Sequence, residues 1–236
     1  MEDVFRQTLG GIVPGGFLIM LYIVSTPIGN LKDITLRALE TLKSVDLIAA
    51  EDTRHTKILL DHYEISKPLT SFFEHNEDRK TQDLIAQLKA GKNIALVSDA
   101  GTPGISDPGY PLIRAAQEEG IKIEVIPGVS AVITALTASG LPSHSFIFEG
   151  FLPVKSGARR KKLEGFKEED RTVIFYESPH RVLKTLKDIV EVLDNPTVVC
   201  ARELTKKFEE IRKGPAEELL VYFTSHPPKG EFVLLI

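Results

Sequence analysis

Short apolar runs alternate with amphipathic segments along most of the chain. The runs Leu21–Ser25, Leu47–Ala50 and Asn93–Ser98 are uninterrupted by charge, which is typical of strands buried inside a parallel sheet. Between the first two runs, apolar residues recur at helical spacing: Leu36, Leu39, Leu42 and Val45. This alternation of strand and helix predicts an α/β fold.

The same pattern predicts a first lobe over residues 20–142. Its helices begin with one that follows an N-cap at Asp33, and Gly or Pro residues mark most of the later boundaries. Further strands are expected through Phe72 and Phe73 and at Ile121–Ile126, and further helices at Thr53–Tyr63, Glu77–Ala90, Tyr110–Glu119 and Val129–Ser139. On the second of these helices, Ile58, Leu59 and Tyr63 are expected to share one face.

A second α/β lobe is predicted over residues 143–236. Its expected strands are Phe146–Leu152, Thr172–Glu177, Thr197–Glu203 and Glu231–Ile236, and its expected helices are Lys155–Phe166, Arg181–Leu193 and Ala216–Phe223. The chain ends inside the last of these strands, so we expect a lobe truncated at its end, whose last strand lacks a partner. Residues 1–19 are interpreted as a leader that need not be native, with Met20 as the true start.

Composition indicates a globular protein of the cytoplasm. Of the 236 residues, 42% are hydrophobic, which is enough for an ordinary core. Cys200 is the only cysteine and lies in an apolar run, so we expect a buried thiol in a reducing compartment. The longest apolar run, Phe17–Val24, is too short to cross a bilayer.

The distribution of charge leaves a nucleic-acid partner open. The net charge of -4 argues weakly against phosphate binding. However, residues 1–150 carry 13 Lys and Arg against 19 Asp and Glu, whereas residues 151–236 carry 16 against 14. This asymmetry is compatible with a basic face on the second lobe.

Four loops follow predicted strands and are candidate ligand sites: Thr26–Asn30, Asp99–Gly109, Pro127–Ala131 and Tyr176–Arg181. Ligands of open α/β sheets bind beyond the carboxyl ends of the strands, where loops and helix N-termini present backbone amides. Taken alone, each loop is more often a simple turn.

The order of short motifs is more specific than any single loop. Seven motifs occur in sequence: Ser25–Asn30, Glu51–Thr56, Ser98–Pro103, Pro127–Gly128, Glu149–Pro153, Tyr176–Ser178 and Arg202–Lys206. Over about residues 20–236 the chain resembles the ribosomal RNA small subunit methyltransferase I family, a branch of the tetrapyrrole methylase superfamily. By contrast, no G-x-G-x-x-G loop of a Rossmann methyltransferase follows the first strand.

The resemblance implies a two-lobe tetrapyrrole methylase-like (class III methyltransferase) fold with the cofactor cleft between the lobes, usually as a homodimer. It implies 2'-O-methylation of a cytidine ribose in small-subunit (16S) ribosomal RNA, free or in the assembled subunit, without a metal. The implied cofactor is S-adenosyl-L-methionine. The residues implied to contact it are Pro27, Asp99, Ala100, Gly101, Ile105, Ser130, Ala131, Tyr176 and Ala201.

Methyl transfer is an in-line displacement, so positioning of the acceptor oxygen contributes much of the catalysis. A ribose hydroxyl is a poor nucleophile, and a base or a nearby cation would assist it. The candidates at strand ends are Lys206, Arg202 and Glu177, together with Arg54 and His55. Structural ion pairs and helix starts are the competing interpretation for each, and Asp52 is the expected cap of the helix at Thr53.

A basic segment follows the motif at Phe151. We expect it to bind RNA phosphates, and the residues concerned are Lys155, Arg159, Arg160, Lys161, Lys162 and Arg181. A solvated helix face is the alternative. The histidines His62, His75, His144 and His226 lack metal-ligand spacing and are expected at the surface.

Two other functions remain open at this stage. A precorrin-type tetrapyrrole methyltransferase would use the same fold and could place its carboxylates on the same cations. A non-catalytic S-adenosylmethionine-binding module that docks on the ribosome would bind the cofactor without methyl transfer.

Overall fold

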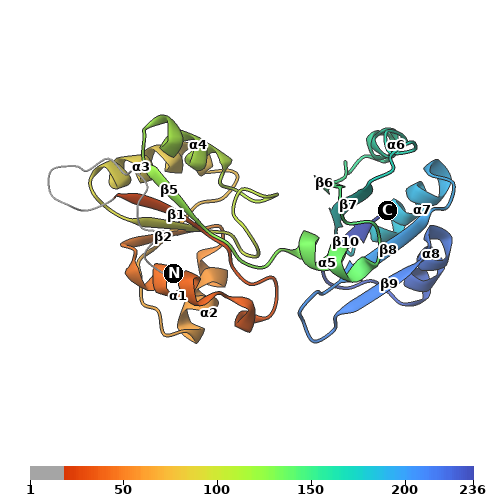
Figure 1. The fold of residues 1–236 in the computed structure, drawn as a ribbon, viewed down its shortest axis with the longest axis horizontal. Helices are drawn as coiled ribbons and strands as arrows, with labels where there is room; N and C mark the ends of the chain where they lie inside the picture. The colour runs from red at the N-terminus through yellow and green to blue at the C-terminus, as the bar shows by residue number, and fades with distance from the viewer. Residues whose placement is uncertain (1–18) are drawn as a thin grey trace. The chain divides into compact units, whose positions relative to one another are not determined.

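The computed structural model describes residues 19–236, so the expected leader lies outside the described residues except for Ile19. The chain divides into two compact units (Figure 1). Of the described residues, the first holds residues 19–27 and Leu31–Gly128, and the second holds Ile28–Asn30 and Val129–Ile236. The division falls at Gly128 instead of after residue 142, because helix α5 (Ala131–Ser139) packs on strands of the second unit.

The first unit contains a five-stranded parallel sheet in the order β3-β2-β4-β1-β5. Strands β2 and β4 are buried at every residue, as their continuous apolar sequences predict. The strands are β1 (Met20–Val24), β2 (Leu47–Ala50), β3 (Leu69–Ser71), β4 (Ile94–Val97) and β5 (Lys122–Ile126).

Helices cover both faces of this sheet. One face carries α1 (Leu36–Ser44) and α2 (Thr53–His62), and the other carries α3 (Glu77–Lys89) and α4 (Tyr110–Glu118) (Figure 1). A short 3-10 helix, η2 (Leu31–Asp33), precedes α1.

Three details of the first unit correct the predictions. Thr35, not Asp33, caps α1, because its side chain accepts a hydrogen bond from the backbone of Ala38. Ile58 is exposed on α2, whose buried residues include Leu59 and Leu60. Strand β3 ends at Ser71, before the expected Phe72 and Phe73.

The second unit contains a five-stranded sheet in the order β6-β7-β10-β8-β9. Strands β6 and β7 are parallel, and the remaining pairs are antiparallel. The strands are β6 (Phe146–Phe151), β7 (Thr172–Glu177), β8 (Thr197–Arg202), β9 (Glu210–Pro215) and β10 (Phe232–Leu235). The expectation that the last strand lacks a partner is wrong, because β10 lies at the centre of the sheet and pairs with both β7 and β8.

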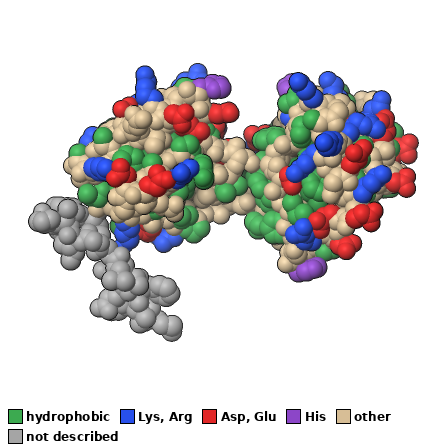
Figure 2. All heavy atoms as spheres, turned by 90° about the horizontal axis from the view of Figure 1, so that it is seen from above, with side chains coloured by type: hydrophobic (Ala, Val, Ile, Leu, Met, Phe, Trp, Pro, Cys, Tyr) green, Lys and Arg blue, Asp and Glu red, His purple; other side chains and the backbone are tan. Residues whose placement is uncertain are grey.

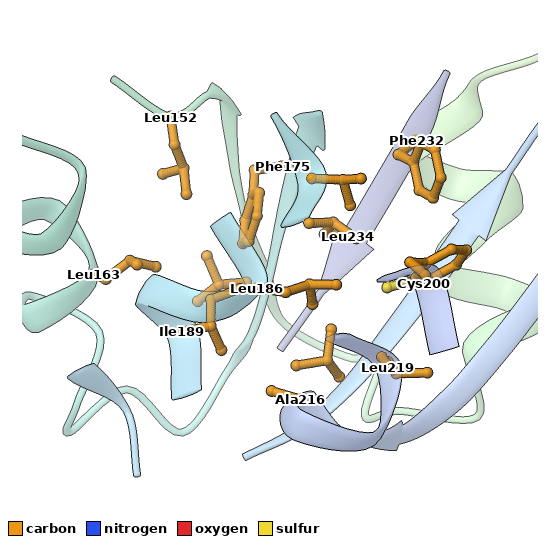
Figure 3. Packing of buried hydrophobic residues seen from close by; sticks show 14 of the residues in the cluster. Leu152, Leu163, Phe175, Leu186, Ile189, Cys200, Ala216, Leu219, Phe232 and Leu234 are labelled. Carbon is orange, nitrogen blue, oxygen red and sulfur yellow. The ribbon is translucent and has the colours of Figure 1, made fainter. Parts of the chain in front are cut away.

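One face of this sheet carries α6 (Ser156–Glu164), α7 (Val182–Val192) and α8 (Ala216–Ser225). Their apolar residues form the core seen in Figure 3, which includes Phe175, Leu186 and Phe232. Cys200 is buried in the same core, as predicted, and burial raises the pKa of its thiol. Helix α5 packs on the other face (Figure 1).

Membrane insertion by a helix finds no support in residues 19–236. None of the helices there has the length and apolar composition that a membrane span requires.

Candidate functional site

The carboxyl edge of the first sheet has the topology of a ligand site. Strand β4 lies between β2 and β1. The chain leaves β1 and β2 toward the face covered by α1 and α2, but it leaves β4 toward the opposite face, which α4 covers. Neighbouring strands whose connections diverge in this way open a crevice at their carboxyl ends, where α/β proteins bind ligands.

Hydrogen bonds fasten the loop after β4 to the end of β1. Thr26 and Gly101 exchange backbone hydrogen bonds of 2.8 and 3.1 Å, and Ser25 Oγ lies 2.8 Å from Thr102 Oγ1. Gly101 has a φ of 76°, a conformation that favours glycine. The expected cofactor residues Pro27, Ala100 and Gly101 therefore lie close together in the first unit, whereas Ile105 is exposed farther along the loop.

The loop after β5 also reaches this edge. A Cβ at Gly128 would lie 2.8 Å from Cβ of Ser25, so only glycine permits the observed approach. This contact explains the Pro127-Gly128 motif by packing, without any ligand.

Acidic groups at the ends of β2 and β4 bind each other's backbone. Asp99 Oδ1 accepts from the backbone N of Asp52 at 3.0 Å, and Glu51 Oε2 accepts from that of Asp99 at 3.2 Å. Burial is the main cause that raises the pKa of Glu51, with a further contribution from the charge of Asp99. Asp99 is thus held at the strand junction by two backbone contacts.

Arg54 and His55 lie on the first turn of α2, where both are exposed. Asp52 caps this helix, as predicted, by accepting from the backbone N of Arg54. The Arg54 guanidinium also hydrogen-bonds to Asp52 and holds the pKa of that carboxyl well below its usual range. The side chain of Arg54 is nevertheless 90% exposed, so it remains accessible to a ligand.

The second sheet also gathers charged residues at one edge, where β7 and β8 end and β9 and β10 begin. Glu177, Phe232, Arg202 and Glu210 lie directly opposite one another in adjacent strands. Directly opposed residues point to the same face of a sheet. Phe232 belongs to the core under α7 and α8, so these charged side chains start on that face.

Glu177 is buried and fully engaged within the protein. Its carboxylate accepts from the backbone N of Ser178 at 2.7 Å and from Thr185 Oγ1 at 2.6 Å. Arg181 Nε lies 3.3 Å away in an ion pair that lacks hydrogen-bond geometry. These contacts give Glu177 a positioning role and disagree with its prediction as a group that meets substrate.

Arg202 takes part in a cluster around Glu210. Its Nε donates to Glu210 Oε2 at 2.6 Å, and Nη1 donates to the carbonyl of Lys229 at 3.2 Å. Glu210 also accepts from Arg212 Nε and from the Tyr222 hydroxyl. Burial acts to raise the pKa of Glu210, but these hydrogen bonds outweigh it and lower the pKa to about 2.

Lys206 lies in a tightly packed segment after β8. Its Nζ donates to Glu203 Oε1 and Glu231 Oε2, each at 2.9 Å. Burial alone would lower the pKa of Lys206, but the two carboxylates outweigh it and raise the pKa. Lys206 is therefore a cation at neutral pH and not a proton acceptor.

The backbone around Lys206 is strained. Glu203 and Thr205 have φ values of 48° and 66°, which are rare for residues other than glycine. The segment is held by a hydrogen bond from the backbone N of Asn30 to Thr205 Oγ1, and a Cβ at Gly29 would overlap Cγ of Lys206. Strain of this kind persists where the surroundings fix it, and it is common at functional sites.

The expected cofactor residues of the second unit lie on the opposite face of the sheet. Tyr176 and Ala201 are both opposite Val233, on the side covered by α5. Ser130 and Ala131 are the N-cap and the first residue of α5. The structure thus associates these four residues with α5 and its sheet face. That all the cofactor residues form one cleft between the lobes stays a prediction.

The basic segment is more neutral than its sequence indicates. Arg159, expected to bind RNA, is buried: its guanidinium pairs with Asp188 at 2.6 Å, and its Nη1 donates to the carbonyl of Val154. That expectation is wrong for Arg159, because its donors are engaged inside the unit. Arg160 pairs with Asp188 and Glu191, and Lys162 pairs with Glu149 at 2.7 Å.

Lys155 and Lys161 are exposed on the same segment and remain candidates for phosphate contact. On the faces visible in Figure 2, Lys and Arg side chains are mixed with Asp and Glu side chains. Any RNA-binding surface on these faces is therefore confined to a few residues, because cations and carboxylates alternate across them.

The histidines His62, His75, His144 and His226 are exposed, as expected. Among residues 19–236, His, Cys, Asp and Glu side chains form no group of three or more that could hold a metal ion.

Two features of the second unit escaped prediction. Strand β9, which supplies Glu210 and Arg212, is highly charged, and its only sequence signal is a weak alternation of polar and apolar residues. Asp188 is one of the buried residues of α7, although aspartate is usually exposed. No local pattern identifies it as the partner of Arg159.

Comparison of the sequence with known proteins identifies the family of this chain. The family model described as Tetrapyrrole (Corrin/Porphyrin) Methylases matches residues 20–220. The chain belongs to the tetrapyrrole methylases. Within this family, it is a member of the ribosomal RNA small subunit methyltransferase I group, as the relatives below establish.

Proteins named ribosomal RNA small subunit methyltransferase I are similar over almost the whole described chain. The one from Haemophilus influenzae is 56% identical over 220 residues, which cover 92% of this chain and 78% of the relative. The one from Thermotoga maritima is 49% identical over 216 residues, which cover 92% of this chain and 97% of the relative.

Solved tetrapyrrole methylase structures share the fold. Diphthine synthase has a TM-score of 0.74 at 15% identity, covering 92% of this chain and 89% of that one. A cobalt precorrin-4 methyltransferase has a TM-score of 0.69 at 20% identity, covering 95% and 98%. Uroporphyrin-III C-methyl transferase from Thermus thermophilus, solved with S-adenosyl homocysteine, has a TM-score of 0.65 at 17% identity, covering 92% and 96%. These matches confirm the predicted fold class.

Proposed function

We propose that this tetrapyrrole methylase transfers the methyl group of S-adenosylmethionine to the ribose 2'-hydroxyl of a cytidine in small-subunit ribosomal RNA. The observation that carries the proposal is the 56% identity, over 92% of the chain, to a protein named ribosomal RNA small subunit methyltransferase I. Action in the cytoplasm, as a homodimer and without a metal, belongs to the same proposal.

The residues at both sheet edges fit S-adenosylmethionine. In the first unit, the hydrogen bonds between Thr26 and Gly101 fix the loop after β4 at the end of β1, and this edge of an α/β sheet is where ligands bind. In the second unit, the side chain of Ser130 makes no cap hydrogen bond to α5, and the amides at a helix N-terminus favour a carboxylate.

Bound S-adenosylmethionine supplies an electrophilic methyl group on a sulfonium. The acceptor hydroxyl then has to approach in line and lose its proton. Lys206 is held by hydrogen bonds to two carboxylates, and in this proposal its ammonium donates to the acceptor oxygen. Arg202 and Glu177 hold the strand ends around it through their partners inside the unit.

The test is transfer of radiolabelled methyl from S-adenosylmethionine to purified small ribosomal subunits that lack the modification. Free small-subunit RNA and a carboxylated tetrapyrrole are the alternative acceptors. Label in the subunits or the free RNA supports the proposal. Label in the tetrapyrrole alone would refute the proposal and favour the precorrin-type activity. Binding of the cofactor without transfer to any acceptor would favour the non-catalytic module.

A further inference from the structure

An extra residue in β6 changes the direction of Phe151. Phe148 pairs with Ile174 and Phe151 pairs with Tyr176, so three steps along β6 match two steps along β7. Gly150, between them, has a φ of 64° and lets the chain form this bulge. In a regular strand, residues three apart point to opposite faces, but the bulge returns Phe151 to the face of Phe148.

The result is a group of three aromatic rings at the carboxyl edge of β6 and β7. The ring of Tyr176 lies 5.0 Å from that of Phe148 and 5.6 Å from that of Phe151, measured between centroids. Phe151 nevertheless remains 55% exposed. A large aromatic side chain that is supported from behind and open in front provides a surface for stacking.

The segment that follows Phe151 is held in place. Arg181 Nη2 donates to the carbonyl of Leu152 at 2.6 Å, and the ion pair with buried Glu177 orients Arg181. The polar network that the structure builds around Glu177 thus fixes the backbone next to the exposed ring. Lys155 lies four residues beyond Phe151 and is exposed, which places a cation on the same segment.

We propose that the Phe151 ring, backed by Tyr176, stacks on the nucleobase of the nucleotide to be methylated. The inference rests on the proposed RNA-methylating function. An enzyme that modifies one nucleotide of a folded RNA has to hold it unstacked, and exposed aromatic rings are the usual stacking partners of such bases. Because Tyr176 is itself an expected cofactor contact, a base on Phe151 lies beside the expected position of the methyl donor.

The experiment compares Phe151→Leu and Phe151→Tyr with the wild-type chain. Phe151→Leu keeps an apolar side chain but removes the ring, so kcat/KM for small subunits should fall about ten-fold. Phe151→Tyr should restore it to within about two-fold. The affinity for S-adenosylhomocysteine, measured by calorimetry, should stay within about two-fold of wild type in both variants.

Phe146→Leu is the matched control, because Phe146 is an exposed aromatic residue at the other end of β6. It should leave kcat/KM unchanged, and thermal melting should show all three variants folded at the assay temperature.

The inference fails if Phe151→Leu is as active as wild type, or if Phe151→Tyr does not restore activity. It also fails if S-adenosylhomocysteine affinity drops by the same factor as kcat/KM, since the ring would then stack on the adenine of the cofactor. A wild-type chain without activity on small subunits would instead refute the proposed function.

Discussion

Arg159 shows how burial changes the role of a charged residue. It lies in a run of cations that predicts phosphate binding, yet its guanidinium is enclosed with Asp188 and contributes to the packing of α6 on α7. Ser156 and Arg160 contact the same carboxylate. A buried charge keeps its partner, because leaving one member of the pair alone in the interior is costly.

Arg159→Ala should therefore destabilise the protein by about 3 kcal/mol, since it leaves the buried Asp188 with weaker partners. Lys161→Ala, a change of the same charge on the same helix, should alter stability by less than about 0.5 kcal/mol. Urea unfolding followed by circular dichroism measures both. Equal stability of the two variants would contradict the structural role of Arg159.

Glu210 makes stability depend on pH. Burial is the largest single effect on its pKa and acts to raise it. The hydrogen bonds from Arg202, Tyr222 and Arg212 together outweigh burial and lower the pKa to about 2. A carboxyl with a depressed pKa in the folded state stabilises the protein fully above its unfolded pKa of about 4.3. This stabilisation is lost as the pH falls from there through about 2.

Glu210→Gln should accordingly reduce the free energy of unfolding by about 1–3 kcal/mol at pH 7, because the two arginines lose their carboxylate. The difference from wild type should stay constant down to about pH 5 and shrink below it. Urea unfolding at a series of pH values measures the difference, with Glu40→Gln as a surface control. A difference that grows toward low pH would contradict the account.

Steric contacts restrict the backbone of the segment that follows β8. Glu203 is in a left-handed conformation, and a Cβ at Gly230 would overlap its carboxyl group. Gly230 itself has a φ of 77°. The approach of this glycine keeps Glu203 in hydrogen-bond contact with Lys206.

Gly230→Ala and Gly91→Ala separate steric overlap from backbone strain. Both glycines have positive φ, but nothing lies within 4 Å of a Cβ at Gly91. Gly91→Ala should cost about 1 kcal/mol of stability. Gly230→Ala should cost a further 1–3 kcal/mol or so from overlap and should also lower methyl transfer by moving Lys206. Equal stability and activity of the two variants would show that the Glu203 side chain moves aside without cost, and would contradict the prediction.

Apolar periodicity predicted most elements because buried strands and amphipathic helices leave a strong pattern. It missed β9, whose sequence Glu-Ile-Arg-Lys-Gly-Pro is rich in charge, because contacts from outside the strand, such as those of Arg202 and Tyr222 with Glu210, help to satisfy these charges. It also placed the cap of α1 at Asp33, because Asp and Thr are both good caps and local sequence does not decide between them.

At the scale of the whole molecule, the motifs predicted the family and the fold, but not which charged residues are free to act. Glu177 and Arg159 follow the expected patterns in sequence and are nevertheless enclosed by partners from distant segments. Such enclosure depends on tertiary packing, which no short motif encodes. The exposed Lys155 and Lys161 remain predicted contacts of RNA.

The double variant Lys155→Ala/Lys161→Ala should weaken binding of small subunits and flatten its salt dependence. The slope of log K against log salt concentration is negative, and each lost phosphate contact reduces its magnitude by roughly 0.7–0.9. Lys57→Ala/Lys89→Ala, the same charge change on the first unit, should leave the slope unchanged. Filter binding from low to moderate salt gives both slopes, and identical slopes for the two double variants would contradict an RNA-binding role.

The most direct measurement of the central claim is the position of the transferred methyl group on the RNA. Small subunits labelled by the protein would be stripped to RNA and hydrolysed with alkali, which cleaves only next to a free 2'-hydroxyl. The account predicts that the label is recovered in an alkali-resistant dinucleotide, which nuclease digestion converts to 2'-O-methylcytidine. Label in an alkali-sensitive mononucleotide, on the base instead of the ribose, would contradict it.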